Sequence, residues 1–229
     1  EAYVWMKKLE FKNMLNRFSV EKPQNPLEEQ FKKIIKRKEA DIVFAQAKES
    51  GKVGFYVLME EQVFGVGVAY DKEHVYLIAA NEDISEEYLL EETGRLIETV
   101  DLASTFDLKS QLPRLSISEK AREHVEDVLI GAYLLNPLKN DYAYDDIAKE
   151  HLGLYVPSRQ DLLGKQTLRE AAGDKPQEIM QFACFMAYIS YESAGILQQK
   201  LQESGMDRLY REIEMPLAYT LYEMEREGV

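Results

Sequence analysis

Three runs rich in β-branched and aromatic residues follow one another along this chain, and they constrain its fold more than any other feature. They read KVGFYVLM over 52–59, QVFGVGVAY over 62–70 and HVYLIAA over 74–80. Residues of these types favour strands, and the very short separations between the runs are typical of antiparallel hairpins. The sequence therefore predicts a three-stranded antiparallel β-meander.

Helical patterns surround this meander. Ser85 is the expected N-cap of a helix over 84–99, and 100–106 (VDLASTF) is a short candidate strand. Two prolines in SVEKPQNP mark a linker between the first two predicted helices. The other predicted helices cover 3–18, 27–38, 119–135, 143–152, a broken region 158–173, 176–204 and 206–227. A sheet covered by helices predicts an α/β or α+β fold.

The charge of the chain is strongly negative and unevenly distributed. The formal net charge is −13, yet residues 1–38 hold ten Lys/Arg against five Glu, which leaves −18 on the remainder. Binding to phosphates requires clustered Lys and Arg. We therefore expect weak or no nucleic-acid binding by this chain alone, and a solvated acidic face over most of its surface. Any DNA contact is expected from the basic N-terminal stretch.

Neither a membrane span nor a disulfide framework is expected. No apolar run approaches the roughly 18 residues that cross a bilayer, and the charged start is not a secretory signal. We therefore expect a soluble cytoplasmic protein. The one cysteine, Cys184, lies within the apolar segment 182–186 and is expected to be a buried core thiol.

Two segments carry a specific resemblance. EDVLIGAYLLNPLKNDYAYDDIAKEHLGL (126–154) is similar to the "D-T-x-L-x-x-Y-L-L-x-P … L-x-x-L-A-x-x-x-L" stretch of the exonuclease domain of bacterial DNA polymerase I, a family A DNA polymerase. LYREIEMPLAYTLYEMEREGV (209–229) resembles the "E-x-P-L-x-x-x-L-x-x-M-E-x-x-G-V" signature that opens the polymerase domain of that family. LEFKNMLNRF (9–18) is similar to the end of the preceding 5′-nuclease domain.

This resemblance implies a fold, a domain division and a context. The implied fold is the ribonuclease H-like exonuclease fold, a mixed sheet with the meander covered by helices. The implied division is 1–26 for the end of the 5′-nuclease region and linker, 27–205 for the exonuclease-like domain and 206–229 for the first polymerase helix. The parent protein would extend DNA from dNTPs in replication and repair, using Mg²⁺ in its polymerase domain and contacting DNA there. A monomer is expected.

The resemblance also implies that the metal-binding carboxylates have been replaced. Exonucleases of this fold hold two divalent metals with four carboxylates. The first motif, "F-D-T-E-T", matches 55–59 and places Tyr56 and Leu58 at the metal positions. The second, "N-L-K-Y-D", matches 107–111 and places Gln111 there. The third, "Y-x-x-x-D", is expected on the long helix, and the best register places Tyr191 at its aspartate. The resemblance therefore implies a chain without a metal or another cofactor, whose role is structural rather than catalytic.

Two other functions stay open at this stage. An active metal-dependent 3′–5′ exonuclease could use relocated ligands, namely Glu60, Asp101, Asp107 and Asp127. Glu60 and Glu61 adjoin the first-motif strand, but adjacent glutamates in a turn point to different sides and are usually solvated. A protein-interaction module could use the acidic face. Asp127 itself corresponds to a structural aspartate of the family, which predicts a hydrogen bond or a helix cap.

The remaining motifs favour structural roles. The GVG at 65–67 lacks the third glycine of a phosphate loop and lies within a predicted strand, so it indicates close strand packing. The three histidines, 74, 124 and 151, have no paired spacing. Phe182, Phe185, Tyr188 and Tyr191 follow helical spacing and are expected in the core. Asp145 and Asp146 survive in the helical region without a ligand role.

Overall fold

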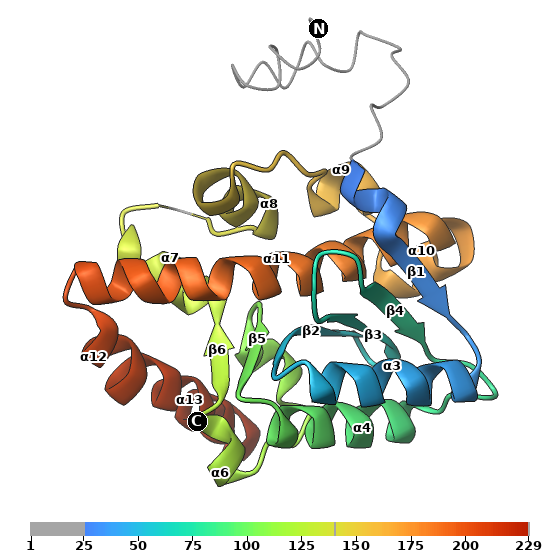
Figure 1. Cartoon of the computed structure of the whole chain (residues 1–229), viewed down its shortest axis with the longest axis horizontal. Coiled ribbons are helices and arrows are strands. Elements are labelled where there is room, and N and C mark those ends of the chain that lie inside the picture. The colour runs from blue at the N-terminus through green and yellow to red at the C-terminus, as the bar shows by residue number, and fades with distance from the viewer. Residues whose placement is uncertain (1–25, 140, 229) are drawn as a thin grey trace, which may run out of the picture.

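A six-stranded mixed sheet forms the centre of the molecule (Figure 1). The computed structural model describes residues 26–139 and 141–228, so the predicted helix over 3–18 lies outside the described residues. The strands are β1 (Phe31–Ile34), β2 (Lys52–Met59), β3 (Val63–Ala69), β4 (Val75–Ala79), β5 (Leu102–Thr105) and β6 (Val125–Asp127). Their order across the sheet is β1-β4-β3-β2-β5-β6.

The predicted meander is confirmed. β2 pairs antiparallel with β3, and β3 pairs antiparallel with β4. β5, which was predicted, runs parallel to β2, and β6 runs parallel to β5. The carboxyl ends of β2, β5 and β6 therefore lie along one edge of the sheet, the usual place for a site in an α/β fold.

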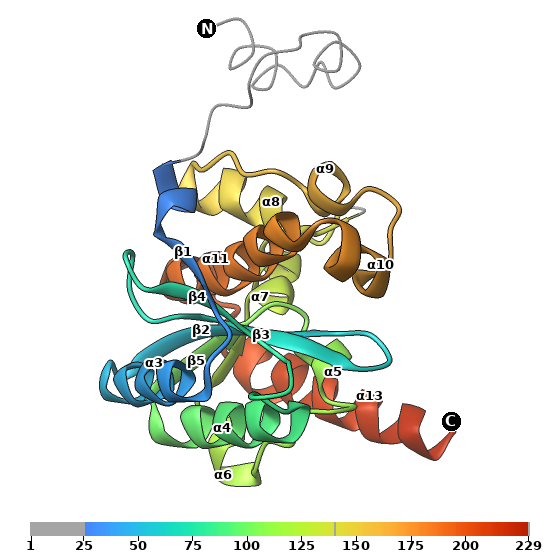
Figure 2. The same ribbon diagram turned by 90° about the vertical axis from the view of Figure 1, so that its right-hand side faces the viewer.

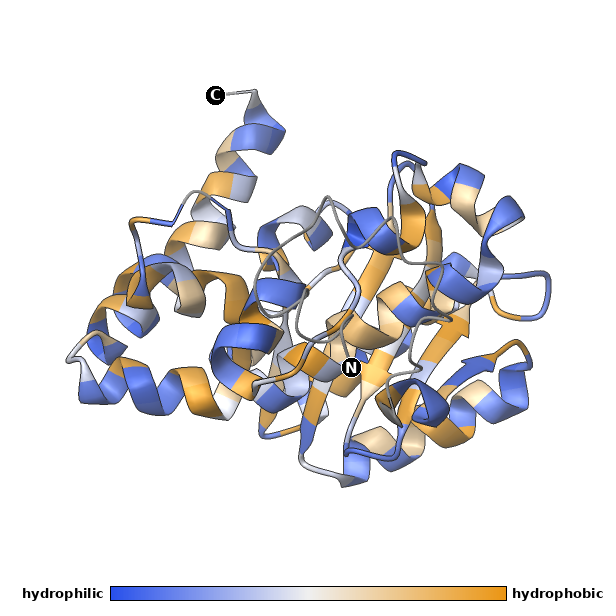
Figure 3. Cartoon of the chain, turned by 90° about the horizontal axis from the view of Figure 1, so that it is seen from above, coloured by the Kyte–Doolittle hydropathy of each residue, from blue (hydrophilic) through white to orange (hydrophobic). Residues whose placement is uncertain are grey.

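Helices cover both faces of this sheet (Figures 1 and 2). One face carries the long helix α11 (Pro176–Glu203), which packs across β2, β3, β4 and β5. The opposite face carries α3 (Arg37–Glu49) and α4 (Glu86–Thr99), and Ser85 caps α4 as predicted by accepting the Tyr88 N–H at 3.2 Å. Figure 3 shows the strands as mostly hydrophobic, whereas the surrounding helices alternate hydrophobic and hydrophilic residues. The predicted mixed α/β class is thus confirmed.

The shorter helices lie around this core. α5 (Leu108–Gln111) follows β5, and α6 (Glu119–Arg122) and α7 (Val128–Leu135) flank β6. The segment above α11 contains α8 (Tyr144–Ile147), the π-helical turn η2 (Ala148–Leu152), α9 (Arg159–Leu163) and α10 (Leu168–Asp174). The chain ends in α12 (Asp207–Leu209), the π-helical turn η3 (Tyr210–Glu214) and α13 (Met215–Glu227).

Two predicted helices are wrong. The region 27–38 is not a helix: it holds a 3₁₀ turn, η1 (Pro26–Gln30), then strand β1, which pairs parallel with β4. Phe31 packs on Phe185 of α11, whereas Ile34 joins the core on the α3–α4 side. Apolar residues three apart fall on opposite faces of a strand, so a strand buried on both faces mimics helical spacing here.

The region 119–135 is likewise not one helix, because β6 interrupts it between α6 and α7. The three residues of β6 are held by parallel pairing with β5, more than twenty positions earlier in the chain. Local periodicity carries no information about such distant pairing.

Two glycines allow α11 to lie close to the sheet. A Cβ on Gly54 would come within 2.1 Å of the Ala187 carbonyl oxygen, and one on Gly67 within 2.4 Å of the Ala183 carbonyl oxygen. The close packing predicted for the GVG segment is therefore confirmed at Gly67.

Candidate functional site

The first-motif strand turns its two predicted site residues toward α11. Leu58 is fully buried in the core between the sheet and α11, and Tyr56 is partly buried, with its ring 6.0 Å from that of Phe182. Phe55 and Val57 point to the α3–α4 core instead. This alternation is the ordinary two-residue period of a strand. Tyr56 and Leu58 thus occupy the face and end of β2 that the sequence predicts for the site.

Gln111 meets β2 at the same place, and its side chain is fully engaged. Its Oε1 accepts the Val57 N–H at 2.8 Å, and its Nε2 donates to the Thr105 hydroxyl at 2.8 Å and to the Phe106 carbonyl at 3.0 Å. Gln111 is 1% exposed. A buried amide needs such partners, and here they join α5 to β2 and to the end of β5.

The structure corrects the register on α11. Tyr191 lies at the start of β2, because Lys52 Nζ is 4.2 Å from its ring centroid and its backbone packs on Gly54. The α11 residues that line the same cleft as Tyr56 are Phe182 and Met186. These two are four residues apart, the spacing of the third motif, and that spacing was the signal available in the sequence. Tyr191 is therefore not brought together with Tyr56, Leu58 and Gln111.

A cleft of about 570 Å³ opens at this end of the sheet. Its floor is formed by Tyr56, Phe106, Phe182 and Met186. Its rim carries carboxylates from three segments, namely Glu60, Asp141, Asp145 and Asp146. Arg159 is the only basic residue among the described residues that line it. The rim is therefore negative, which opposes the approach of a phosphate backbone.

Burial and charge both act on the Tyr56 hydroxyl. Burial raises the pKa of Tyr56 to about 12, nearby Asp107 raises it further, and Arg159 opposes the increase. The phenol therefore stays protonated and neutral at physiological pH. A neutral phenol is a poor replacement for a metal-binding carboxylate.

Asp127 fills the structural role predicted for it. Its carboxylate caps α7 by accepting the Leu129 N–H at 2.9 Å, and it also accepts the N–H groups of Asp107 at 3.1 Å and Leu108 at 2.7 Å. Asp107 has a left-handed backbone with φ of 55°, and this bond helps to hold it there. Burial raises the pKa of Asp127 to about 7, while the N–H groups lower it.

The proposed relocated ligands do not form one site. Glu60 accepts the Leu168 N–H at 2.8 Å, at the start of α10. Asp101 precedes β5 and Asp127 follows it, so these two carboxylates lie at opposite ends of that strand. Asp107 is partly buried beside Asp127, and Glu61 is exposed with its carbonyl 3.4 Å from Arg114 Nη1. Within residues 26–139 and 141–228, no three His, Cys, Asp or Glu side chains gather in a metal-binding arrangement.

A two-metal centre does not fit the residues at the end of β2. The donors that Mg²⁺ prefers are oxygens free to coordinate, and most often carboxylates. Leu58 and Phe182 have none, and the one amide oxygen of Gln111 is committed to the Val57 N–H. The chemistry of this donor set therefore gives no basis for a metal-dependent step here.

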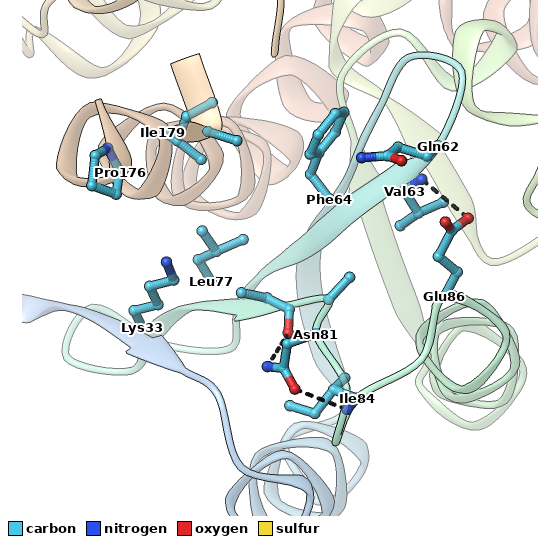
Figure 4. A pocket seen from close by; sticks show the side chains of 13 residues that line it. Lys33, Gln62, Val63, Phe64, Leu77, Asn81, Ile84, Glu86, Pro176 and Ile179 are labelled. Atoms are coloured by element: carbon cyan, nitrogen blue, oxygen red, sulfur yellow. Dashed lines mark hydrogen bonds between the residues drawn. The ribbon is translucent and has the colours of Figure 1, made fainter. Parts of the chain in front are cut away.

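A second cavity, of about 390 Å³, lies between β3, β4 and the start of α11 (Figure 4). Its polar side chains serve the fold: Glu86 accepts the Val63 N–H at 3.2 Å, and Asn81 accepts the Ile84 N–H at 3.1 Å. Leu77 and Ile179 supply much of its apolar wall. This arrangement resembles a packing defect between elements more than a set of converging catalytic groups.

The other sequence predictions near the site can now be placed. Cys184 is fully buried on α11, as expected, and burial raises the pKa of its thiol. Phe182, Phe185 and Tyr188 are buried as predicted, whereas Tyr191 is only partly buried. In the described part of the chain, no helix has both the length and the apolar composition needed to cross a membrane.

Solved structures share this fold. The polymerase domain of Pol1 from M. smegmatis, in complex with DNA primer-template and dNTP, matches with a TM-score of 0.62 and 15% identity over 85% of this chain. Brucella melitensis NrnC bound to pGG matches with a TM-score of 0.54 and 13% identity, covering 77% of this chain and 84% of its own. The Aedes aegypti Nibbler EXO domain matches with a TM-score of 0.53 and 12% identity, covering 83% of this chain and 96% of its own.

These likenesses show a ribonuclease H-like 3′–5′ exonuclease fold. The chain aligns with only 32% of the length of the M. smegmatis structure. No protein-family profile matches the chain. No curated protein matches its sequence.

Proposed function

We propose that this chain is a catalytically inactive 3′–5′ exonuclease-like domain that serves as a structural module of a family A DNA polymerase I. The observation that carries the proposal is the closed floor of the cleft. Leu58 is fully buried at one metal position, and the Gln111 amide ties β2 to the end of β5 at another. Each replacement stabilises the site as packed protein.

The replacements also have a physical logic. A ring of carboxylates without metals would be a costly cluster of like charges in a buried place. Apolar and aromatic side chains fill the same space without that cost. The cleft floor thus contributes to the folded core, and the acidic rim above it disfavours a nucleic-acid strand.

The C-terminal helices support the structural role. The Tyr210 hydroxyl accepts the Asp127 N–H at 2.8 Å, and Arg211 pairs with the buried Glu126 at 3.1 Å. Lys109 pairs with Glu225 of α13 at 2.5 Å. The helix whose sequence resembles the opening of a polymerase domain is therefore fastened to the exonuclease-like body. Such fastening would fix the geometry of a polymerase domain that follows it, while DNA synthesis from dNTPs takes place there.

A degradation assay tests the proposal. A single-stranded oligonucleotide labelled near its 5′ end is incubated with the chain in Mg²⁺ or Mn²⁺, and shortened products are resolved on a gel. We expect no shortening. Stepwise trimming from the 3′ end that is lost in both Glu60→Gln and Asp107→Asn would overturn the proposal and support relocated ligands. The variant Glu98→Gln, on the far side of the sheet, controls for loss of a carboxylate as such.

A further inference from the structure

The cleft at the end of β2 joins an aromatic floor to an acidic rim. Tyr56 and Phe182 present rings to a volume of about 570 Å³, and Asp141 and Asp146 stand among the carboxylates around it. Aromatic faces and carboxylates both attract cations, and the rings also accept apolar side chains. The ligand that suits this surface is a segment with basic residues beside apolar ones.

The described chain begins close to this cleft. Glu28 of η1 accepts a hydrogen bond from Gln181 of α11 at 2.7 Å, and the next residue of α11 is Phe182, on the cleft floor. Figures 1 and 2 both place this first coloured part of the chain, in blue, near α8 and α9. Any segment that precedes residue 26 is therefore delivered to the cleft side of the molecule.

Residues 3–18 have the chemistry that the cleft requires. Their sequence, YVWMKKLEFKNMLNRF, contains basic and apolar side chains in alternation. The basic ones are Lys7, Lys8, Lys12 and Arg17; the larger apolar ones include Trp5, Leu9, Phe11, Leu15 and Phe18. The connection over 19–25 can span up to about 25 Å when extended. Tethering also gives the segment an effective concentration on the order of millimolar.

We propose that residues 3–18 bind in the cleft of the same chain. Their Lys and Arg side chains lie against the carboxylate rim, and their apolar side chains rest on the Tyr56–Phe182 floor. The segment then covers aromatic surface that would otherwise face water, and it closes the cleft to other ligands. This inference goes beyond the structural role proposed above and does not depend on the loss of nuclease chemistry.

The single tryptophan of the chain, Trp5, reports directly on this contact. Its emission maximum and its quenching by acrylamide are measured in the full chain. Docking predicts a blue-shifted, protected Trp5 in the unaltered chain. The variant Asp141→Lys with Asp146→Lys reverses the rim and is expected to shift the emission to the red and increase the quenching. The matched control is Glu82→Lys with Glu98→Lys, two exposed carboxylates outside the cleft, which is expected to leave both readings unchanged.

A charge swap guards against misfolding of the rim variant. Lys7→Glu with Lys8→Glu alters only the segment and is expected to expose Trp5 in the same way. Combining it with the rim reversal is expected to restore the protection. Equal Trp5 quenching in all variants would overturn the proposal. Protection that weakens on dilution would also overturn it, because it would show that the segment binds a second copy instead.

Discussion

The floor and the rim of the cleft treat acidic side chains in opposite ways. On the floor, Leu58 and Gln111 are both almost completely buried and carry no charge. On the rim, Asp141 is exposed and Asp146 is paired with Lys139 at 3.4 Å. Water and partners make a carboxylate cheap on the rim, whereas burial penalises it on the floor. The comparison shows where this fold tolerates acids once its site is not arranged around metals.

Returning a carboxylate to the floor should have the largest effect. We expect Leu58→Glu to lower the free energy of unfolding by about 3–5 kcal/mol, because it buries a charge without a partner. Urea denaturation measures this change. The matched control is Leu138→Glu, since Leu138 is 92% exposed and the same substitution there should cost little. Recovery of the lost stability on adding Mg²⁺ would contradict the account, because it would reveal ligands that complete a metal site.

The pH dependence of stability should come next. Because the folded pKa of Asp127 is raised from 3.8 to about 7, its contribution to stability is complete below pH 3.8 and is lost as the pH rises toward 7. The slope should reach about 1.4 kcal/mol per pH unit within that window. Denaturation at several pH values should show this slope in the unaltered chain and its loss in Asp127→Asn. An identical slope in Asp107→Asn and the unaltered chain is the control, and an unchanged slope in Asp127→Asn would refute the assignment.

Removing the Gln111 amide should have an intermediate effect. In Gln111→Leu the Val57 N–H and the Thr105 hydroxyl lose their buried partner, which we expect to cost about 1–3 kcal/mol. The same substitution at Gln160, which is exposed on the rim, should leave stability nearly unchanged. Equal costs at the two positions would show that the floor gains nothing from this network.

Neutralising the rim should have the smallest effect on stability. Asp141→Asn with Asp146→Asn removes two charges that water or a surface lysine already satisfies, so the expected change is within about 0.5 kcal/mol. Thermal unfolding at low and high salt measures it. A large loss, comparable to that of Leu58→Glu, would remove the distinction between floor and rim.

The sequence predicted the centre of the fold better than its edges. The meander and α11 follow from strong local patterns, as does the helix that Ser85 caps. β1 and β6 were missed because each is short and is held by pairing with a distant strand, which no local window records. Phe31 and Ile34 even imitate helical spacing because they are buried on opposite faces.

The candidate site was likewise predicted in part. The strand motif placed Tyr56 and Leu58 correctly on the face toward α11, and Asp127 took its expected capping role. Tyr191 was chosen from a helix with no aspartate to fix the register, and only the packing of Gly54 and Gly67 on α11 reveals which turn faces Tyr56. The partners of Gln111 also depend on tertiary contacts that the sequence does not display.

The central claim is that the floor holds no metal, and paramagnetic NMR tests it at the residues concerned. Mn²⁺ is titrated into the chain labelled with ¹⁵N, and broadening is followed at the Val57 N–H and the Gln111 side-chain amide. The account predicts that these signals broaden no more than those of exposed carboxylate-bearing segments such as the start of α4. Selective, saturable broadening at Val57 and Gln111 would contradict it, because it would place a metal ion at the end of β2.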